Sequence, residues 1–173
     1  MNTRRAVVLA GGLALLGGCG FKLRQPPKLA FETIRSPGNF ATPVARELMR
    51  ALEQAGVRVL PPEPPRQPGL PPPTSEPVDV VLDVLADQRE RAVVGITATG
   101  QVRELQLRTR FRFRLRSGQG ADLIEDSELL QTRDISFTET AVLGKEAEEA
   151  LMYKDMQTDI VQQVLRRLSV VKR

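Results

Sequence analysis

The sequence predicts a two-layer α/β (α+β) fold, in which two helices pack on one face of a mixed sheet of four to five strands. The first observation is an apolar segment at 29–35, an amphipathic segment beginning near residue 42, and a second apolar segment at 57–60. Such a strand–helix–strand unit is expected to have parallel strands. The second observation is a series of alternating segments between 78 and 137, separated by glycine-containing turns, which is typical of an antiparallel meander. A final amphipathic helix completes the sandwich, in the order β-α-β-(proline-rich loop)-β-β-β-α.

The first helix has signals at both ends. Thr42 is placed to cap it, and Pro43 suits its first position. Gly56 follows as a C-terminal cap. The apolar residues that fall on one face of this helix are Val44, Leu48, Leu52 and Ala55.

Residues 61–77 (PPEPPRQPGLPPPTSEP) form a proline-rich loop between the two halves of the fold. Proline lacks a backbone donor, so this segment cannot be a helix or an interior strand. The simpler interpretation is an extended surface loop. The alternative is a docking peptide of the PxxP kind.

Three strands are expected after the loop. Residues 78–85 and 91–97 form either one long, bulged strand or two short ones, and a strand at 102–116 follows the turn at 99–101. A second turn contains two glycines, which supply the positive φ that turns need. The third, more polar strand covers 122–137.

The last helix is expected from about Glu146 to Leu168. Glu146, Glu148 and Glu149 lie near its positive end, whereas arginines lie near its negative end, which suits the helix dipole. Its buried stripe is predicted to be Tyr153, Met156, Ile160, Val164 and Leu168.

The composition argues against an enzyme. The chain has no His and one Cys, so the commonest general base and the commonest metal ligand are both missing. No Gly-x-Ser-x-Gly, P-loop or Cys/His cluster occurs in the sequence. Acidic pairs such as Asp79 and Asp83 stand outside any motif and are interpreted as solvated strand residues. No metal and no cofactor is therefore expected.

The N-terminus has the pattern of a secretory signal peptide over residues 1–18. Two arginines precede an apolar run at 6–16, which is too short for the roughly 20 residues of a membrane-spanning helix. The only Cys, Cys19, follows Leu-Gly-Gly directly, which resembles the bacterial lipobox. A free thiol is the alternative, but a lone Cys in an exported chain calls for another explanation. The resemblance implies a covalent lipid on Cys19, and Gly20 in place of Asp implies the outer membrane.

Cleavage of 18 of the 173 residues would leave 155 residues, enough for one packed core. The net charge would fall from +4 to +2 with the loss of Arg4 and Arg5. We expect a lipidated tether at 19–28 and one domain at 29–170, on the periplasmic side of the membrane. No later apolar run is long enough to cross a membrane.

Five arginines alternate with apolar residues in the segment LRTRFRFRLRSG. Successive side chains of a strand point to opposite faces, so Leu107, Phe111, Phe113 and Leu115 should face the helices. The arginines that should then share the open face are Arg108, Arg110, Arg112, Arg114 and Arg116.

Two interpretations of this arginine face remain open. Cross-strand carboxylates could relieve the repulsion, and the candidates are Asp79, Asp83, Asp87, Glu125 and Glu128. Alternatively, the arginines contact an external partner. Nucleic acid is excluded, because an exported protein does not normally meet it and the exposed face lacks stacking aromatic residues. The phosphates of lipopolysaccharide are the anionic groups of a Gram-negative outer membrane, and arginine binds phosphate in a bidentate manner.

The mature start CGFKLR, at Cys19–Arg24, resembles that of the LptE family of lipopolysaccharide-assembly lipoproteins. Further matches follow in order along nearly the whole mature chain except the proline-rich loop. They are F-x-T-I at Phe31–Ile34, REL…L…GV at Arg46–Val57, G-Q-x-x-E-L-Q-L at Gly100–Leu107, Arg133, and K-D-M at Lys154–Met156.

The resemblance implies a plug inside a large outer-membrane β-barrel, the LPS-assembly protein LptD, in a 1:1 complex. It also implies binding of lipopolysaccharide through basic residues near one end of the sheet. Lys145 matches one of these by position. Ala98 stands where the family has a second basic residue, and Arg103 is the hypothetical substitute because it lies close in the sequence.

Two other functions compete with the plug. One is a free-standing periplasmic module that binds lipopolysaccharide or phospholipid, which should enclose an apolar cavity. The other is an accessory lipoprotein of another envelope complex. Co-purification of a barrel distinguishes the plug from both.

Overall fold

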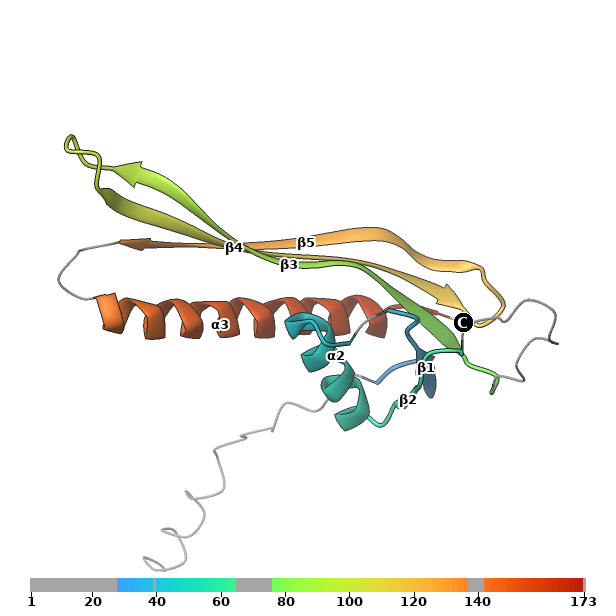
Figure 1. Ribbon diagram of the computed structural model, residues 1–173. Helices are drawn as coiled ribbons and strands as arrows, with labels where there is room; N and C mark the ends of the chain where they lie inside the picture. Colours follow the sequence, from blue (N-terminus) through green and yellow to red (C-terminus); the bar gives the residue numbers. More distant parts are fainter. Residues whose placement is uncertain (1–27, 39, 65–75, 137–141, 173) are drawn as a thin grey trace, which may run out of the picture.

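The computed structural model describes residues 28–38, 40–64, 76–136 and 142–172 (Figure 1). The elements in chain order are β1 (Thr33–Arg35), α2 (Pro43–Gln54), β2 (Arg58–Leu60), β3 (Val80–Ile96), β4 (Val102–Ser117), β5 (Asp122–Ser136) and α3 (Val142–Ser169). The five strands form one sheet in the order β2-β1-β3-β4-β5. The predicted order of helices and strands is confirmed.

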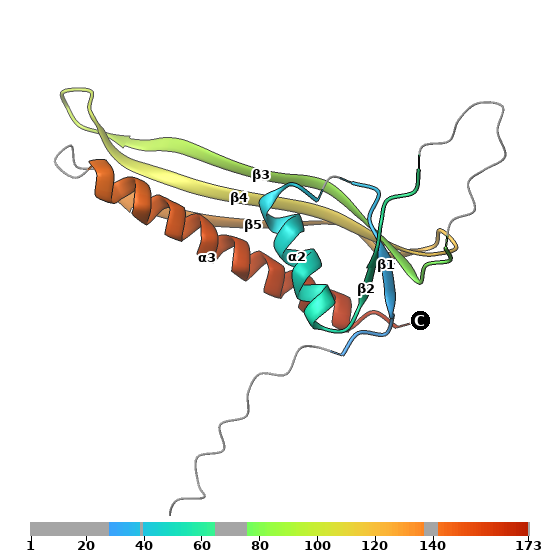
Figure 2. The same cartoon turned by 60° about the horizontal axis from the view of Figure 1, so that its bottom comes forward.

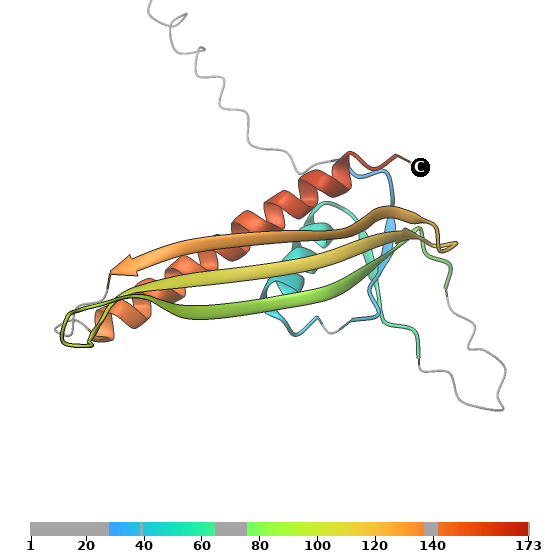
Figure 3. The same cartoon turned by 90° about the horizontal axis from the view of Figure 1, so that it is seen from above.

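The two helices cover one face of the sheet, and the other face of the three long strands is open (Figures 1 and 3). The long strands β3, β4 and β5 are antiparallel neighbours, as the meander prediction required. The short strands β1 and β2 lie beside α2 at one end of the molecule. We call this the proximal end, and we call the opposite end, with the β3–β4 turn and the start of α3, the distal end.

The βαβ unit has the predicted parallel pairing of β1 with β2. Its helix begins at Pro43, and Gly56 follows it with a φ of 88°, a conformation that glycine adopts without strain. The first strand is shorter than the predicted segment 29–35. Asp79 Oδ2 accepts the backbone N–H groups of Glu32 and Thr33, so a side chain replaces the strand partner there.

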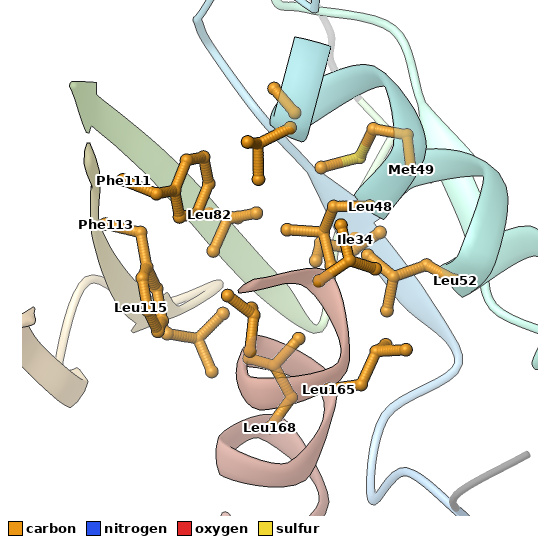
Figure 4. Close-up of a cluster of buried hydrophobic side chains, with 14 of the residues drawn as sticks. Ile34, Leu48, Met49, Leu52, Leu82, Phe111, Phe113, Leu115, Leu165 and Leu168 are labelled. Atoms are coloured by element: carbon orange, nitrogen blue, oxygen red, sulfur yellow. The ribbon is translucent and has the colours of Figure 1, made fainter. Parts of the chain in front are cut away.

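The main core lies between the two helices and the proximal half of the sheet (Figure 4). Phe111 and Phe113 from β4 are fully buried, with ring centroids 5.9 Å apart. Their partners from the other elements include Ile34, Leu48, Leu52, Leu82, Leu165 and Leu168. A second, smaller cluster at the distal half is formed by Leu105, Leu107, Ile135 and Met156. These two cores fix α3 along the sheet.

Strand β3 is one long, bulged strand, so the first of the two alternatives for this segment is confirmed. Val84 lies opposite Phe113 and Ala86 lies opposite Arg112, which leaves Leu85 as the extra residue of a bulge. Because a one-residue shift exchanges the two faces of a strand, Asp83 and Asp87 lie on opposite faces. Asp83 lies opposite Arg114, on the open face, and Asp87 lies opposite Phe111, on the helix face.

Helix α3 begins at Val142, earlier than the predicted Glu146. Lys145 therefore lies in its first turn, and the first turn contains no acidic residue. The predicted pairing of glutamates with the positive end of the dipole is wrong, because Glu146 and its neighbours lie a turn further along. The prediction of basic residues in the last turn is confirmed. Four residues of the predicted stripe are buried, and Tyr153 is half-buried, with its hydroxyl donating to the carbonyl of Glu90 at 2.7 Å.

Candidate functional site: the arginine face and the distal end

The alternation predicted for β4 is confirmed. Leu107, Phe111, Phe113 and Leu115 are all 0% exposed, and Thr109 is equally buried on the same face. The arginine side chains between them are partly exposed, for example 40% for Arg114. They form the arginine face defined above, which runs along the open side of the central strand.

Asp83 forms ion pairs with two of the arginines. Its Oδ2 accepts from Arg116 Nε at 2.7 Å and from Arg114 Nη2 at 3.2 Å, and its Oδ1 accepts from Arg116 Nη2 at 3.0 Å. Burial of Asp83 tends to raise its pKa, but the hydrogen bonds and charges of Arg116 and Arg114 outweigh this and lower the pKa. Asp83 is only 8% exposed, so the prediction that it is a solvated strand residue is wrong.

The next arginines are paired with carboxylates of β5. Arg112 forms a bidentate pair with Asp126, through Nη2 to Oδ2 and Nε to Oδ1, and the hydrogen bond with Asp126 is the main cause of the raised pKa of Arg112. Glu128 lies between two arginines, 3.8 Å from both Arg110 Nε and Arg112 Nε. Arg108 Nε donates to Gln106 Oε1 at 2.8 Å. The sheet itself therefore supplies most of the charge that balances the arginine face.

Cross-strand pairing is confirmed for two of the five carboxylates proposed from sequence, Asp83 and Glu128. The prediction of cross-strand pairing is wrong for Asp79 and Asp87, because both carboxylates accept hydrogen bonds from backbone N–H groups instead. Asp87 Oδ2 accepts from Val44 N at 2.9 Å and from Ala45 N at 3.0 Å, at the start of α2. Thr42, the predicted cap of that helix, makes no capping hydrogen bond with its side chain.

The remaining candidate, Glu125, shows the effect of a second irregularity. Between β4 and β5 the register runs from Phe113 opposite Ser127 to Leu115 opposite Ile124. Two residues of β5, Glu125 and Asp126, therefore share the place opposite Arg114. Asp126 turns to Arg112, whereas Glu125 is exposed and has no ion pair within the part of the chain that the structure describes. Sequence reasoning missed Asp126 because strict alternation does not reveal a bulge.

The two residues predicted to bind lipopolysaccharide both lie at the distal end. Arg103 is the second residue of β4, and Lys145 is in the first turn of α3; Figure 1 shows both element starts at this end. Arg103 is exposed and has no hydrogen bond or ion pair with any described side chain. Lys145 Nζ contacts Glu148 Oε2 at 2.7 Å, and its side chain is 23% exposed. Ala98 lies exposed in the turn between β3 and β4.

Apolar side chains accompany these cations at the distal end. The last part of β3 exposes Val93, Val94 and Ile96, which are 54%, 48% and 65% exposed. Leu151 of α3 is 62% exposed. The distal end therefore combines free or loosely paired cations with an apolar surface.

Several predictions fall on residues outside the described ranges. They concern the signal peptide at 1–18, the lipidated Cys19 and the middle of the proline-rich loop. The described ends of that loop, 61–64 and 76–77, form neither helix nor strand, as expected. Among the described residues, no cluster of three potential ligands for a metal ion occurs. No helix in those residues combines the length and the apolar character needed to cross a membrane.

Comparisons with known proteins place this fold in a family. The family model described as "LptE: Lipopolysaccharide-assembly" matches residues 28–168. The solution structure of an uncharacterized lipoprotein B from Nitrosomonas europaea is 30% identical, with a TM-score of 0.67, over 87% of this chain and 90% of that one. A search of curated proteins finds no match.

Two crystal structures share the fold at lower identity. The rare lipoprotein B of Shewanella oneidensis is 18% identical, with a TM-score of 0.61, over 79% of this chain and 93% of that one. A minor lipoprotein of Acinetobacter baumannii is 19% identical, with a TM-score of 0.59, over 82% and 92% of the two chains. Because the family model covers most of the chain, the protein belongs to the LptE family of lipopolysaccharide-assembly lipoproteins.

Proposed function

We propose that this protein is the non-enzymatic lipoprotein subunit of an outer-membrane lipopolysaccharide translocon. It occupies the lumen of an LptD-like β-barrel in a 1:1 complex, helps to assemble that barrel, and binds lipopolysaccharide on its way to the outer leaflet. A lipid on Cys19 holds it on the periplasmic side of the membrane. The observation that carries this proposal is the match of the LptE family model to residues 28–168.

The chemistry of the arginine face favours contact with a polar wall over binding of phosphate. Four of its five arginines already pair with Asp83, Asp126 or Glu128, so most of their guanidinium groups are engaged within the sheet. A surface of paired, half-exposed charges keeps its hydrogen bonds when it meets a polar barrel lumen. Burying the same charges in an apolar interface would cost more in lost hydration.

The distal end is better suited to lipopolysaccharide. Arg103 is free to bind a phosphate in a bidentate manner. Lys145 could exchange its exposed partner Glu148, since exposed ion pairs contribute little energy. The apolar side chains of Val93, Val94 and Ile96 lie on the same hairpin and complement a ligand that has acyl chains as well as phosphates.

The partner is tested by a pull-down from native membranes. A tag after Arg173 is used to purify the gently solubilised protein, and mass spectrometry identifies what accompanies it. A large outer-membrane barrel at equal stoichiometry is expected. Recovery of the lipoprotein alone, or with a different complex, would overturn the plug and favour an accessory or free-standing lipoprotein.

The lipopolysaccharide site is tested by charge reversal. Arg103→Glu with Lys145→Glu should weaken lipopolysaccharide binding strongly. The matched control is Arg50→Glu with Lys154→Glu, two residues that line the groove between α2 and α3. It changes the net charge of the protein by the same amount and should leave lipopolysaccharide binding intact. Unchanged binding by the first variant would show that the distal assignment is wrong.

A free-standing lipid carrier is the weaker candidate. Such a protein needs an enclosed apolar cavity for acyl chains. The groove between α2 and α3 has a volume of about 350 Å³, but it is open and is lined mainly by polar residues, including Glu47, Arg50, Gln54, Lys154 and Thr158. Within the described part of the chain this groove does not offer an apolar container.

A further inference from the structure

Four exposed cations that take no part in the arginine face lie at the proximal end. They are Lys28, Arg166, Arg167 and Lys172, all exposed. None of the four side chains has a hydrogen bond or ion pair with another described residue. We call these four residues the basic end.

The packing brings the four residues together although they come from opposite ends of the described chain. Leu29 follows Lys28 and packs against the main core, and Val171 precedes Lys172 and packs against the same core. Leu165 and Leu168, on either side of Arg166 and Arg167, belong to that core. Figures 2 and 3 show the start of the described chain beside the end of α3.

Few charges oppose the basic end. The exposed carboxylates on neighbouring elements are Glu32, before β1, and Glu53, in the last turn of α2. Arg58 and Glu76 nearby neutralise each other at 2.7 Å. The basic end therefore keeps an excess of positive charge, which the partial negative charge at the carbonyl end of α3 offsets only in part.

An apolar side chain stands among these cations. Val170 is 75% exposed, the largest exposure among the large apolar residues of the described chain. Val170 directly follows the last residue of α3, Ser169, and lies in the chain between the two arginines and Lys172. Cations flanking an exposed apolar residue are the arrangement found where a protein lies on a membrane surface.

The proposed lipid anchor would keep the basic end close to a membrane surface, which favours a membrane as its partner. Lys28 is nine positions after Cys19, so an extended tether spans at most about 30 Å. Lys22 and Arg24 add two positive charges to this tether. We infer that the basic end docks on the anionic phospholipid headgroups of the membrane that holds the lipid anchor, with Val170 at the headgroup boundary.

This inference goes beyond the proposed function, because neither the barrel nor lipopolysaccharide takes part in it. Each basic residue close to an anionic surface favours the docked state by a factor of about five. The effect should fade with salt, since charges are screened beyond about 10 Å at 0.1 M. Tethering raises the local concentration of the basic end at the membrane, so a weak surface contact suffices.

The test uses the full lipidated protein in vesicles. If Cys19 carries the lipid, Val170→Cys introduces the one reactive thiol, which is labelled with a polarity-sensitive fluorophore. The probe at position 170 should report an apolar environment in vesicles that contain phosphatidylglycerol and water in vesicles of phosphatidylcholine alone. A probe introduced by Ala98→Cys, at the distal turn, should report water in both.

Charge variants locate the effect. Arg166→Gln with Arg167→Gln should lower the docked-to-free ratio about 25-fold, from two factors of about five. Circular dichroism checks that α3 is retained. Arg50→Gln with Lys154→Gln removes the same charge from another face and should leave docking unchanged.

The outcomes separate this inference from the proposed anchor and function. Docking would be overturned, with the anchor unaffected, by either of two results. The probe at position 170 could report water in the phosphatidylglycerol vesicles, or it could report an equally apolar environment in both kinds of vesicle. Equal loss in the control charge variant would overturn the basic end as the docking site. Release of the protein from the vesicles on washing would overturn the lipid anchor and docking together. None of these results affects barrel co-purification, which tests the plug.

Discussion

The proximal and distal ends of the molecule are built on the same three strands but differ in how those strands are supported. At the proximal end, β1, α2 and the second half of α3 all contribute to the main core. At the distal end the strands continue with a four-residue core and only α3 beneath them. Stability within a protein follows such local packing, so the two ends should open at different free energies. The same long strands therefore connect a well-packed proximal end to a distal end that should be less stable.

Phe111→Ala should have the largest effect on this difference, because it removes the centre of the main core. Phe111 is 0% exposed and stacks with Phe113. Loss of such a side chain costs about 3–5 kcal/mol. Urea unfolding should show this decrease in global stability. A cost below about 1 kcal/mol, the size of a tolerated volume-conserving swap, would mean that the proximal end is not the stable base.

Met156→Ala removes the helix residue of the distal core. Met156 is 0% exposed, and the expected cost is about 2 kcal/mol, at the low end for such truncations because the small cluster can relax. Hydrogen exchange should accelerate in the distal halves of β4 and β5 while β1 and α2 remain protected. Uniform acceleration along the whole sheet would show that the two ends open as one unit.

Asp83→Asn tests the part of the arginine face that pairs with Asp83. The substitution leaves Arg114 and Arg116 without their shared carboxylate and should cost about 1–3 kcal/mol, the value of hydrogen bonds to a charged group. The matched control is Glu125→Gln, which touches no ion pair among the described residues and should be neutral.

The pH dependence of this difference has a definite sign. The pKa of Asp83 is lowered from its ordinary value of 3.8, so its contribution is complete above that pH and is lost as the pH falls through the lower, folded pKa. The stability of the native protein relative to Asp83→Asn should therefore be constant near neutral pH and shrink below about pH 4. Urea titrations of both proteins from pH 7 to pH 3 measure it. A difference that grows with acid would contradict the pairing.

Asp87→Ala should have the smallest effect of the four. It frees the N–H groups of Val44 and Ala45 at the start of α2, and loss of a helix cap costs about 1 kcal/mol. Thr42→Val serves as the control, because the Thr42 side chain makes no capping bond. If the Thr42 variant is the more destabilised of the two, the cap has been assigned to the wrong residue.

The fold could be predicted from sequence because its signals are periodic. The alternation of β4 and the helical spacing of α3 assign each buried residue to its face without any knowledge of the partner strands. The proline-rich loop and Gly56 mark boundaries for the same local reason. Helix and strand ends were less accurate, as the early start of α3 shows.

The partners of the aspartates could not be predicted in the same way. Alternation gives Asp83 and Asp87 the same face, and only the bulge at Leu85 separates them. A bulge depends on pairing with the neighbouring strand, which a single sequence does not display. The candidate site at the distal end came from a family resemblance, since an exposed Arg103 and a Lys145 beside Glu148 have no periodic signature.

The length of β4 has a consequence for reach. Its 16 residues, at about 3.3 Å each, extend for about 50 Å, and α3 runs beneath the strand as a stiffening rod. A bilayer with its headgroups is about 40–45 Å thick. A molecule held at its proximal end and standing along the membrane normal would carry the β3–β4 turn to the opposite leaflet without any change of shape. The sheet would then hold the proximal end and the β3–β4 turn at a fixed separation across the membrane.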